Sequence, residues 1–176
     1  MGAQTEPQVL HDRAEIAATV SRLAAEVKSD YQDKHPLLIG VLKGSFIFMA
    51  DLIRQLDFPL EVDFIGAASY GCSTRSSGQV KLNHRLQSEV RGREVLLVED
   101  IVDTGLTTAC LLDHMRRKKP ASLKLCALTD KPSRRKVPVT IDYLGFTVPD
   151  RFLVGYGLDL GQKFRNLPDI CALEEA

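Results

Sequence analysis

The fold of this chain is decided by the stretch Val95-Leu96-Leu97-Val98-Glu99-Asp100-Ile101-Val102-Asp103-Thr104-Gly105-Leu106-Thr107-Thr108. Its first four residues are all apolar, which is typical of a strand buried in a sheet. Two carboxylates follow, and the chain then passes through a glycine into residues with helical spacing at Leu111, Leu112 and Met115. Ligands of open α/β sheets bind beyond the carboxyl ends of the strands. The stretch therefore predicts an α/β sheet with a ligand site after residue 98.

On both sides of this stretch, predicted strands alternate with predicted helices. An amphipathic helix begins at Asp12, which forms a capping box with Glu15, and ends near residue 31. A second helix, capped by Ser45, spans 46–56, and a third follows residue 104. We expect strands at 37–42, 61–70, 80–86, 95–98, 123–128, 143–148 and 152–156. This order predicts a single α/β domain, residues 1–176, with a mostly parallel sheet covered by helices on both faces.

Two segments of the chain lack this regular patterning. Residues 1–10 are polar and contain a proline, so we expect a loose N-terminal arm. Residues 71–79 are small and polar without periodicity, which is typical of a mobile loop. Flanked by the strands at 61–70 and 80–86, this loop predicts a long hairpin that projects from the body of the protein.

The composition argues against several classes of partner. Lys plus Arg and Asp plus Glu are both 23 in the 176 residues, so no overall charge attracts nucleic acid or an anionic membrane. The four cysteines are far apart and form no Cys-x-x-Cys pair, so we expect free thiols in the cytoplasm rather than a zinc site. We find no secretory signal and no apolar run of the ~18 residues that a membrane span requires.

The loop after the apolar strand has two parts with different chemistry. Thr104 to Thr108 enter a helix, whose first N–H groups have no internal partner and form a phosphate cradle together with the threonine hydroxyls. Glu99 and Asp100 precede this cradle, and a buried carboxylate pair becomes favourable where it accepts hydrogen bonds from a sugar diol or meets Mg²⁺. Asp103 is a candidate acid or base. The alternative is that all these residues are plain helix-capping and turn residues.

Residues 98–107 resemble the phosphoribosyl diphosphate signature of the type I phosphoribosyltransferases. Further segments resemble the hypoxanthine-guanine branch of that family: 41–44, Ser69-Tyr70, Lys131, and 149–159 with the sequence PDRFLVGYGLD. The resemblance extends from about residue 38 to residue 172. It implies a type I phosphoribosyltransferase fold, in which a central, mostly parallel sheet flanked by helices carries a small hood and a flexible lid hairpin.

The resemblance also implies a reaction and its partners. The enzyme would transfer 5-phosphoribosyl from phosphoribosyl diphosphate to hypoxanthine or guanine with Mg²⁺, giving IMP or GMP and pyrophosphate in purine salvage. The family forms homodimers or homotetramers, and the choice between hypoxanthine and guanine stays open. The residues that would bind substrate are Lys43, Gly44, Ser69, Tyr70, Glu99, Asp100, Asp103, Thr104, Gly105, Leu106, Thr107, Thr108, Lys131, Phe152, Leu153, Asp159 and Arg165.

Within this set, the resemblance implies more specific roles. Asp103 would be the catalytic acid/base at the purine imidazole ring, and Glu99, Asp100 and Asp159 would lie at the metal. The turn at Lys43-Gly44, in this family often with a cis peptide, and Arg165 would meet pyrophosphate. Lys131 would contact the 6-oxo group, Phe152 would stack on the base and Leu153 would read its edge. Ser69-Tyr70 would begin the lid that excludes water.

Two rival functions remain open from the sequence. One is a regulatory protein of the same fold that senses nucleotide and binds RNA through basic runs at 116–119 and 134–136. A run of bases at the end of a helix is more often a solvated group that compensates the helix dipole. The other rival is a phosphoribosyltransferase for another base, such as xanthine or a pyrimidine, which Lys131 and Phe152 disfavour.

Overall fold

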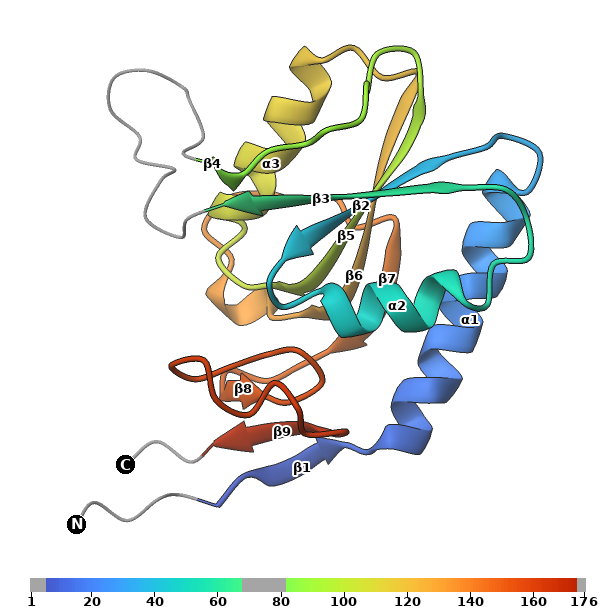
Figure 1. The fold of residues 1–176 in the computed structure, drawn as a ribbon. Helices are drawn as coiled ribbons and strands as arrows, with labels where there is room; N and C mark the ends of the chain where they lie inside the picture. Colours follow the sequence, from blue (N-terminus) through green and yellow to red (C-terminus); the bar gives the residue numbers. More distant parts are fainter. Residues whose placement is uncertain (1–5, 68–81, 174–176) are drawn as a thin grey trace.

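The computed structural model of this chain describes residues 6–67 and 82–173. Its main sheet has six strands in the order β4-β3-β2-β5-β6-β7 (Figure 1). The strands are β2 (Leu37–Leu42), β3 (Glu61–Ala67), β4 (Leu82–His84), β5 (Glu94–Val102), β6 (Ser122–Asp130) and β7 (Tyr143–Thr147). All neighbours pair in parallel except β3 and β4, which are antiparallel. The prediction of a mostly parallel α/β sheet is confirmed.

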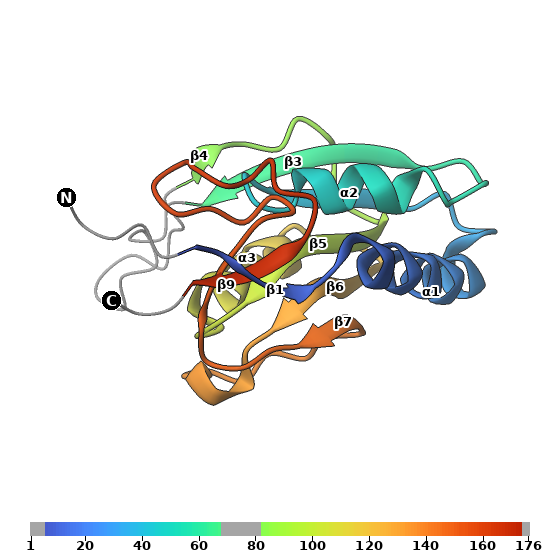
Figure 2. The same ribbon diagram turned by 90° about the horizontal axis from the view of Figure 1, so that it is seen from below.

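Helices cover both faces of this sheet. One face packs on α1 (Arg13–Tyr31) and α2 (Phe46–Ile53), and the other packs on α3 (Leu106–Arg117) (Figures 1 and 2). Successive side chains of a strand point to opposite faces, so Leu96 and Val98 join the first core while Leu97 joins the second. Burial on both faces explains why the central strands appear in the sequence as continuous apolar runs.

A smaller antiparallel sheet lies beside the carboxyl ends of the main strands and corresponds to the expected hood. It has the order β1-β9-β8, with β1 (Gln8–His11), β9 (Ile170–Leu173) and β8 (Phe152–Val154) (Figure 1). Two predictions are therefore wrong. The N-terminal arm is not loose from residue 8 onward, because it pairs with β9, and the strand at 152 belongs to this small sheet rather than to the main one.

The helix starts give one confirmation and one correction. Asp12 accepts hydrogen bonds from the amides of residues 14 and 15 at 2.8 and 2.9 Å, and the Glu15 carboxylate accepts from the Asp12 amide at 3.0 Å. This is the predicted capping box. Ser45 does not cap α2 with its side chain, because its hydroxyl donates back to the Val41 carbonyl at 2.7 Å. The helix also ends at Ile53, three residues earlier than expected.

The central strand is longer than the sequence indicated. We expected it to end at residue 98, but β5 continues to Val102, so Glu99 and Asp100 lie in the strand and not in a loop. Pairing with β6 extends it, with Glu99 opposite Ala127 and Val102 opposite Asp130. Ser69, Tyr70, most of the predicted lid and the first two residues of the strand expected at 80–86 lie outside the described residues. Within the described part of the chain, no helix has the length and apolar character that crossing a bilayer requires.

Candidate functional site

A cavity of about 680 Å³ lies at the carboxyl ends of β2 and β5. It is bounded by the turn after β2, the end of β5, the start of α3 and the loop after β8. The lining residues are Val41, Leu42, Lys43, Gly44, Glu99, Asp100, Ile101, Asp103, Thr104, Gly105, Leu106, Thr107, Thr108, Asp159, Gln162 and Arg165. The structure thus brings together twelve of the predicted site residues from three separate segments of the chain.

Two buried carboxylates form the floor of this cavity. Glu99 is 7% exposed and Asp100 is 9% exposed. Burial, together with the neighbouring Asp100, raises the pKa of Glu99 well above its usual value. Burial raises the pKa of Asp100 to about 6, although backbone hydrogen bonds and the Arg165 charge oppose this rise. The Glu99 Oε2 atom accepts no hydrogen bond from the described residues, so this pair lacks the partners that a ligand would supply.

The turn after β2 packs tightly against this floor. The peptide bond between Leu42 and Lys43 is cis, in agreement with the family resemblance. A Cβ atom added to Gly44 would lie 1.6 Å from the Asp100 Oδ2 atom, so only glycine fits at this position. The Lys43 ammonium points across the cavity and donates to the Gln162 side-chain oxygen at 3.1 Å. The turn therefore places the Lys43 cation and the backbone of Gly44 beside the carboxylates.

The start of α3 forms the opposite wall. Gly105 precedes the helix with a φ of 81°, a left-handed conformation that favours glycine, and a Cβ there would lie 2.9 Å from the Val137 carbonyl oxygen. The Ala109 amide donates to the Gly105 carbonyl at 2.8 Å, which begins the hydrogen-bond ladder of the helix. The amides of residues 106–108 precede that ladder, and the Leu106 amide donates to the Thr104 hydroxyl at 3.4 Å. Amides at a helix start and threonine hydroxyls are donors of the kind that bind an anion.

Two arginines that the sequence suggested as part of a basic surface instead support this wall. Arg135 donates to the carbonyls of Val102 and Asp103 at 3.2 and 3.1 Å and also pairs with Asp130. Arg134 Nε lies 3.3 Å from Asp103 Oδ1, an ion pair without hydrogen-bond geometry, since this buried oxygen accepts no hydrogen bond among the described residues. Arg134 Nη1 also lies 3.6 Å from the Asp150 carboxylate. The basic run at 134–136 thus holds residues 102–105, the end of β5 and the turn that carries Asp103 (the acidic loop), a role that no sequence pattern indicated.

Lys131 and Phe152 do not line the cavity, but they lie on segments beside it, after β6 and at the start of β8. Lys131 is only 4% exposed, and its ammonium donates to the Arg151 carbonyl at 2.8 Å. Its amide donates to the Val102 carbonyl at 3.0 Å, which ties it to the acidic loop. Phe152 is 46% exposed, whereas Leu153 is buried. Lysines are usually exposed and aromatic rings are usually buried, so both residues are in unusual positions.

Asp159 and Arg165 form a pair at the remaining edge. The Arg165 Nη2 atom lies 2.7 Å from Asp159 Oδ1, and Nη1 donates to the Gly157 carbonyl at 2.7 Å. The other Asp159 oxygen accepts from the Gln162 amide at 2.7 Å. Gln162, which the sequence did not single out, therefore organises both Lys43 and Asp159. The described residues contain no group of three or more His, Cys, Asp or Glu side chains placed to hold a metal ion by themselves.

Comparisons with known proteins agree with this geometry. Residues 8–160 match the family model described as the phosphoribosyl transferase domain. The chain is 50% identical over 169 residues to the hypoxanthine-guanine phosphoribosyltransferase of Bacillus subtilis, covering 96% of this chain and 94% of the relative. It is 45% identical to the hypoxanthine-guanine-xanthine phosphoribosyltransferase of Tritrichomonas foetus, covering 96% and 92% of the two chains.

Solved structures lead to the same group of proteins. The crystal structure of a hypoxanthine-guanine phosphoribosyltransferase from Bacillus anthracis superposes with a TM-score of 0.90 at 43% sequence identity and covers 97% of this chain and 100% of its own. The matching family model covers the strand, the acidic loop and the helix start that line the cavity. The chain therefore belongs to the phosphoribosyltransferase family and, within it, to the hypoxanthine-guanine phosphoribosyltransferases.

Proposed function

We propose that this protein transfers the 5-phosphoribosyl group of phosphoribosyl diphosphate to hypoxanthine or guanine, releasing pyrophosphate and IMP or GMP. One observation carries the proposal. A pair of buried carboxylates, Glu99 and Asp100, lines the same cavity as a helix start that is suited to phosphate. A phosphorylated ribose carries both matching groups, a diol and a phosphate. The names of the relatives described above support the same reaction.

Mg²⁺ fits the donor set of this cavity. Glu99 Oε2 is a buried oxygen that lacks a partner among the described residues, and carboxylate oxygens are the donors that Mg²⁺ prefers. Mg²⁺ usually takes one or two carboxylates and completes its shell with water and substrate oxygens, so a cluster of three protein ligands is not required. Bound there, Mg²⁺ would neutralise charge on the pyrophosphate. We propose Glu99 and Asp100 as its nearest protein groups, with Asp159 beside them.

The residues of the chain divide the reaction between them. Thr104 to Thr108 hold the 5-phosphate, and Lys43, Gly44 and Arg165 hold the pyrophosphate that departs. As the bond from ribose C1′ to pyrophosphate breaks, the ring carbon becomes positive, and the carboxylates of the cavity floor stabilise that charge. The purine nitrogen then forms the new bond to C1′. Asp103 accepts the proton that the imidazole ring of the base loses.

Base recognition is assigned to the segments beside the cavity. The buried Lys131 ammonium offers a fixed donor, which suits the carbonyl of a 6-oxopurine and disfavours the amino group of adenine. The exposed Phe152 ring offers a stacking surface, and the Leu153 backbone lies next to it in β8. These positions support hypoxanthine and guanine over a pyrimidine.

The RNA-binding alternative has less support. Arg134 and Arg135 face the acidic loop rather than forming an outward basic surface. Arg116, in the other basic run, pairs with Asp113 on the same helix at 2.9 Å. A nucleotide sensor has no need for a group that accepts a proton from the base, whereas Asp103 in the cavity lining is our candidate for that role.

A direct assay tests the proposal. Protein, Mg²⁺ and phosphoribosyl diphosphate are mixed separately with hypoxanthine, guanine, xanthine, adenine or uracil, and nucleotide formation is followed by chromatography. We expect IMP or GMP with the first two bases. The absence of product with both would refute the proposal, and binding of RNA without turnover would favour the sensor.

Assembly and location are further parts of the proposal. We propose a homodimer or homotetramer, supported by Phe46, an aromatic residue at the start of α2 that is 43% exposed. Light scattering after size-exclusion chromatography would measure the mass. We propose a cytoplasmic location, because the three cysteines among the described residues are free thiols.

A further inference from the structure

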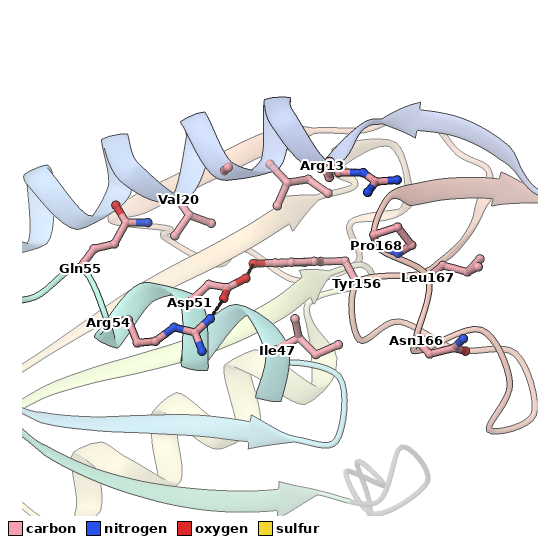
Figure 3. Close-up of a pocket in the computed structure, with 12 residues that line it drawn as sticks. Arg13, Val20, Ile47, Asp51, Arg54, Gln55, Tyr156, Asn166, Leu167 and Pro168 are labelled. Carbon is pink, nitrogen blue, oxygen red and sulfur yellow. Dashed lines mark hydrogen bonds and ion pairs between the residues drawn. The ribbon is translucent and has the colours of Figure 1, made fainter.

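A second cavity, of about 510 Å³, lies behind the pyrophosphate side of the site (Figure 3). It opens between α1, α2 and the loop that follows β8. Its walls are mainly apolar, and a partly buried hydrogen bond lies in them: the Tyr156 hydroxyl donates to the Asp51 carboxylate of α2 at 2.5 Å. Figure 3 shows this bond, with Arg54 on the far side of Asp51. None of these three residues lines the cavity that carries the proposed chemistry.

Tyr156 lies in the loop after β8, next to the residues proposed to hold pyrophosphate. Its backbone has a φ of 49°, between two glycines with φ of 93° and 101°, so the chain makes a tight left-handed path here. The next residue, Gly157, packs so closely on the turn after β2 that an added Cβ would lie 2.1 Å from the Gly44 carbonyl oxygen. The Gly157 carbonyl also accepts from Arg165 at 2.7 Å. A shift of Tyr156 would therefore move both groups proposed to hold pyrophosphate.

These contacts close a ring through the structure. The turn at Lys43-Gly44 leads directly into α2, α2 carries Asp51, Asp51 holds Tyr156, and Gly157 returns to the turn. Without the hydroxyl bond the ring is open, and the loop after β8 is joined to the turn by the backbone contact at Gly157 and by the Lys43–Gln162 hydrogen bond. The Tyr156 ring borders the cavity on one side, so packing fixes its position less than it would in a filled core.

We propose that Asp51 and Tyr156 are positioning residues for phosphoribosyl diphosphate, acting through Gly157 on the Lys43-Gly44 turn and on Arg165. This inference rests on the proposed function and adds residues outside the site to it. The base side should be insensitive to the pair. Phe152 and Leu153 are held independently, because β8 pairs with β9. Burial, with the bond to Asp51, also raises the pKa of Tyr156, so its hydroxyl stays protonated and remains a donor at neutral pH.

The variant Tyr156→Phe removes the hydroxyl and keeps the ring. We expect its dissociation constant for phosphoribosyl diphosphate with Mg²⁺, measured by calorimetric titration without base, to rise about three- to tenfold. The KM for phosphoribosyl diphosphate should rise in parallel, while kcat and the KM for hypoxanthine change by less than about twofold. Asp51→Asn retains an oxygen acceptor and should lie closer to the unaltered protein than Asp51→Ala does.

The chain offers a matched control in Tyr143. Its hydroxyl also donates to an aspartate, Asp30, at 2.5 Å, and accepts from the Lys124 ammonium at 3.1 Å; the residue is 5% exposed against 7% for Tyr156. It lies at the opposite end of the sheet, at the start of β7. Tyr143→Phe should lower the melting temperature by a similar amount and leave the dissociation constant unchanged.

The outcomes separate this inference from the proposed function. If the unaltered protein binds phosphoribosyl diphosphate but Tyr156→Phe binds it equally well, the positioning role is wrong and the proposed function stands. Equal weakening in Tyr156→Phe and Tyr143→Phe would also overturn it, because a general loss of stability would then explain both. If the unaltered protein does not bind phosphoribosyl diphosphate at all, the proposed function fails and the inference fails with it.

Discussion

The replacement Asp100→Asn should stabilise the metal-free protein while abolishing its activity. Asp100 is buried in the cavity floor, and burial raises its pKa from 3.8 to about 6. At neutral pH the free protein must therefore keep a charge that its surroundings disfavour. Asparagine has nearly the same shape and carries no charge, so it removes this cost. It also removes a carboxylate that the proposed reaction needs at the ribose and the metal.

The magnitude and pH dependence follow from the two pKa values. Below pH 3.8 the carboxyl group is protonated in both the folded and the unfolded chain, and the substitution gains nothing. Between pH 3.8 and about 6 the unfolded chain releases its proton first, so the unaltered protein loses stability as the pH rises. Above pH 6 the unaltered protein has lost all of this contribution, which is at most about 3 kcal/mol of its free energy of unfolding. Because the buried amide also loses hydration, we expect a gain of about 1–3 kcal/mol.

Thermal unfolding in EDTA at pH 4, 5, 6, 7 and 8 measures this effect. The melting temperature of Asp100→Asn should match the unaltered protein at pH 4 and exceed it by about 3–10 °C at pH 7. Asp63→Asn is the matched control with the opposite sign. Burial raises the pKa of Asp63, but hydrogen bonds from the amides of residues 64, 87 and 88 outweigh it and lower the pKa overall. Asp63→Asn should therefore destabilise the protein at pH 7.

A clear result would refute the reasoning about the cavity floor. If Asp100→Asn melts at the same temperature as the unaltered protein at pH 7, or lower, then the free protein does not carry a disfavoured charge at this position. A gain that is equal at pH 4 and pH 8 would point to packing rather than to ionisation. Retention of full transferase activity would contradict the role of Asp100 at the ribose and the metal.

Three further substitutions test the site at other points. Asp103→Asn should lower kcat about 10²- to 10⁴-fold with little change in the dissociation constant for phosphoribosyl diphosphate, and equal losses in both would contradict the acid/base role. Lys131→Met should lower the ratio of kcat/KM for hypoxanthine to kcat/KM for adenine about a hundredfold. If this ratio is unchanged, Lys131 does not recognise the 6-oxo group. Gly44→Ala should displace Asp100 and cut kcat/KM about a hundredfold in steady-state assays, and a fully active variant would show that the turn adapts.

The parts of the fold that could be predicted from sequence are those with strong local signals. The capping box at Asp12 and Glu15 fixes the start of α1 through contacts three residues apart, and the buried strands show as apolar runs. The strands β1 and β9 were missed because they have four residues each, and because β1 forms only by pairing with β9, more than 150 residues away in the chain. Neither strand has enough residues for a clear alternation.

The site shows the same division between local and distant information. The helix start within the segment from Asp103 to Thr108 was predictable, because a glycine between an apolar strand and residues with helical spacing marks such a turn. The burial of Glu99 and Asp100 inside β5 was not, because the extra length of that strand depends on pairing with β6. Arg134 and Arg135 were interpreted as part of a surface run, because a run of charges in a sequence does not reveal which way each side chain points.

The charges of the site match an anionic substrate that binds together with a divalent cation. Each cation of the site already has a provisional acceptor: Lys43 has Gln162, Arg165 has Asp159, and Lys131 has a backbone carbonyl. These contacts hold the side chains in place, and phosphate oxygens can replace them at little reorganisation cost. The carboxylates at 99 and 100 form no ion pair within the described residues, and burial raises both pKa values, although the Arg165 charge opposes the rise at Asp100. A ligand that brings hydroxyl donors and a divalent cation supplies partners for this pair, so its binding should lower both pKa values, and Asp100 should release its proton on binding below about pH 6.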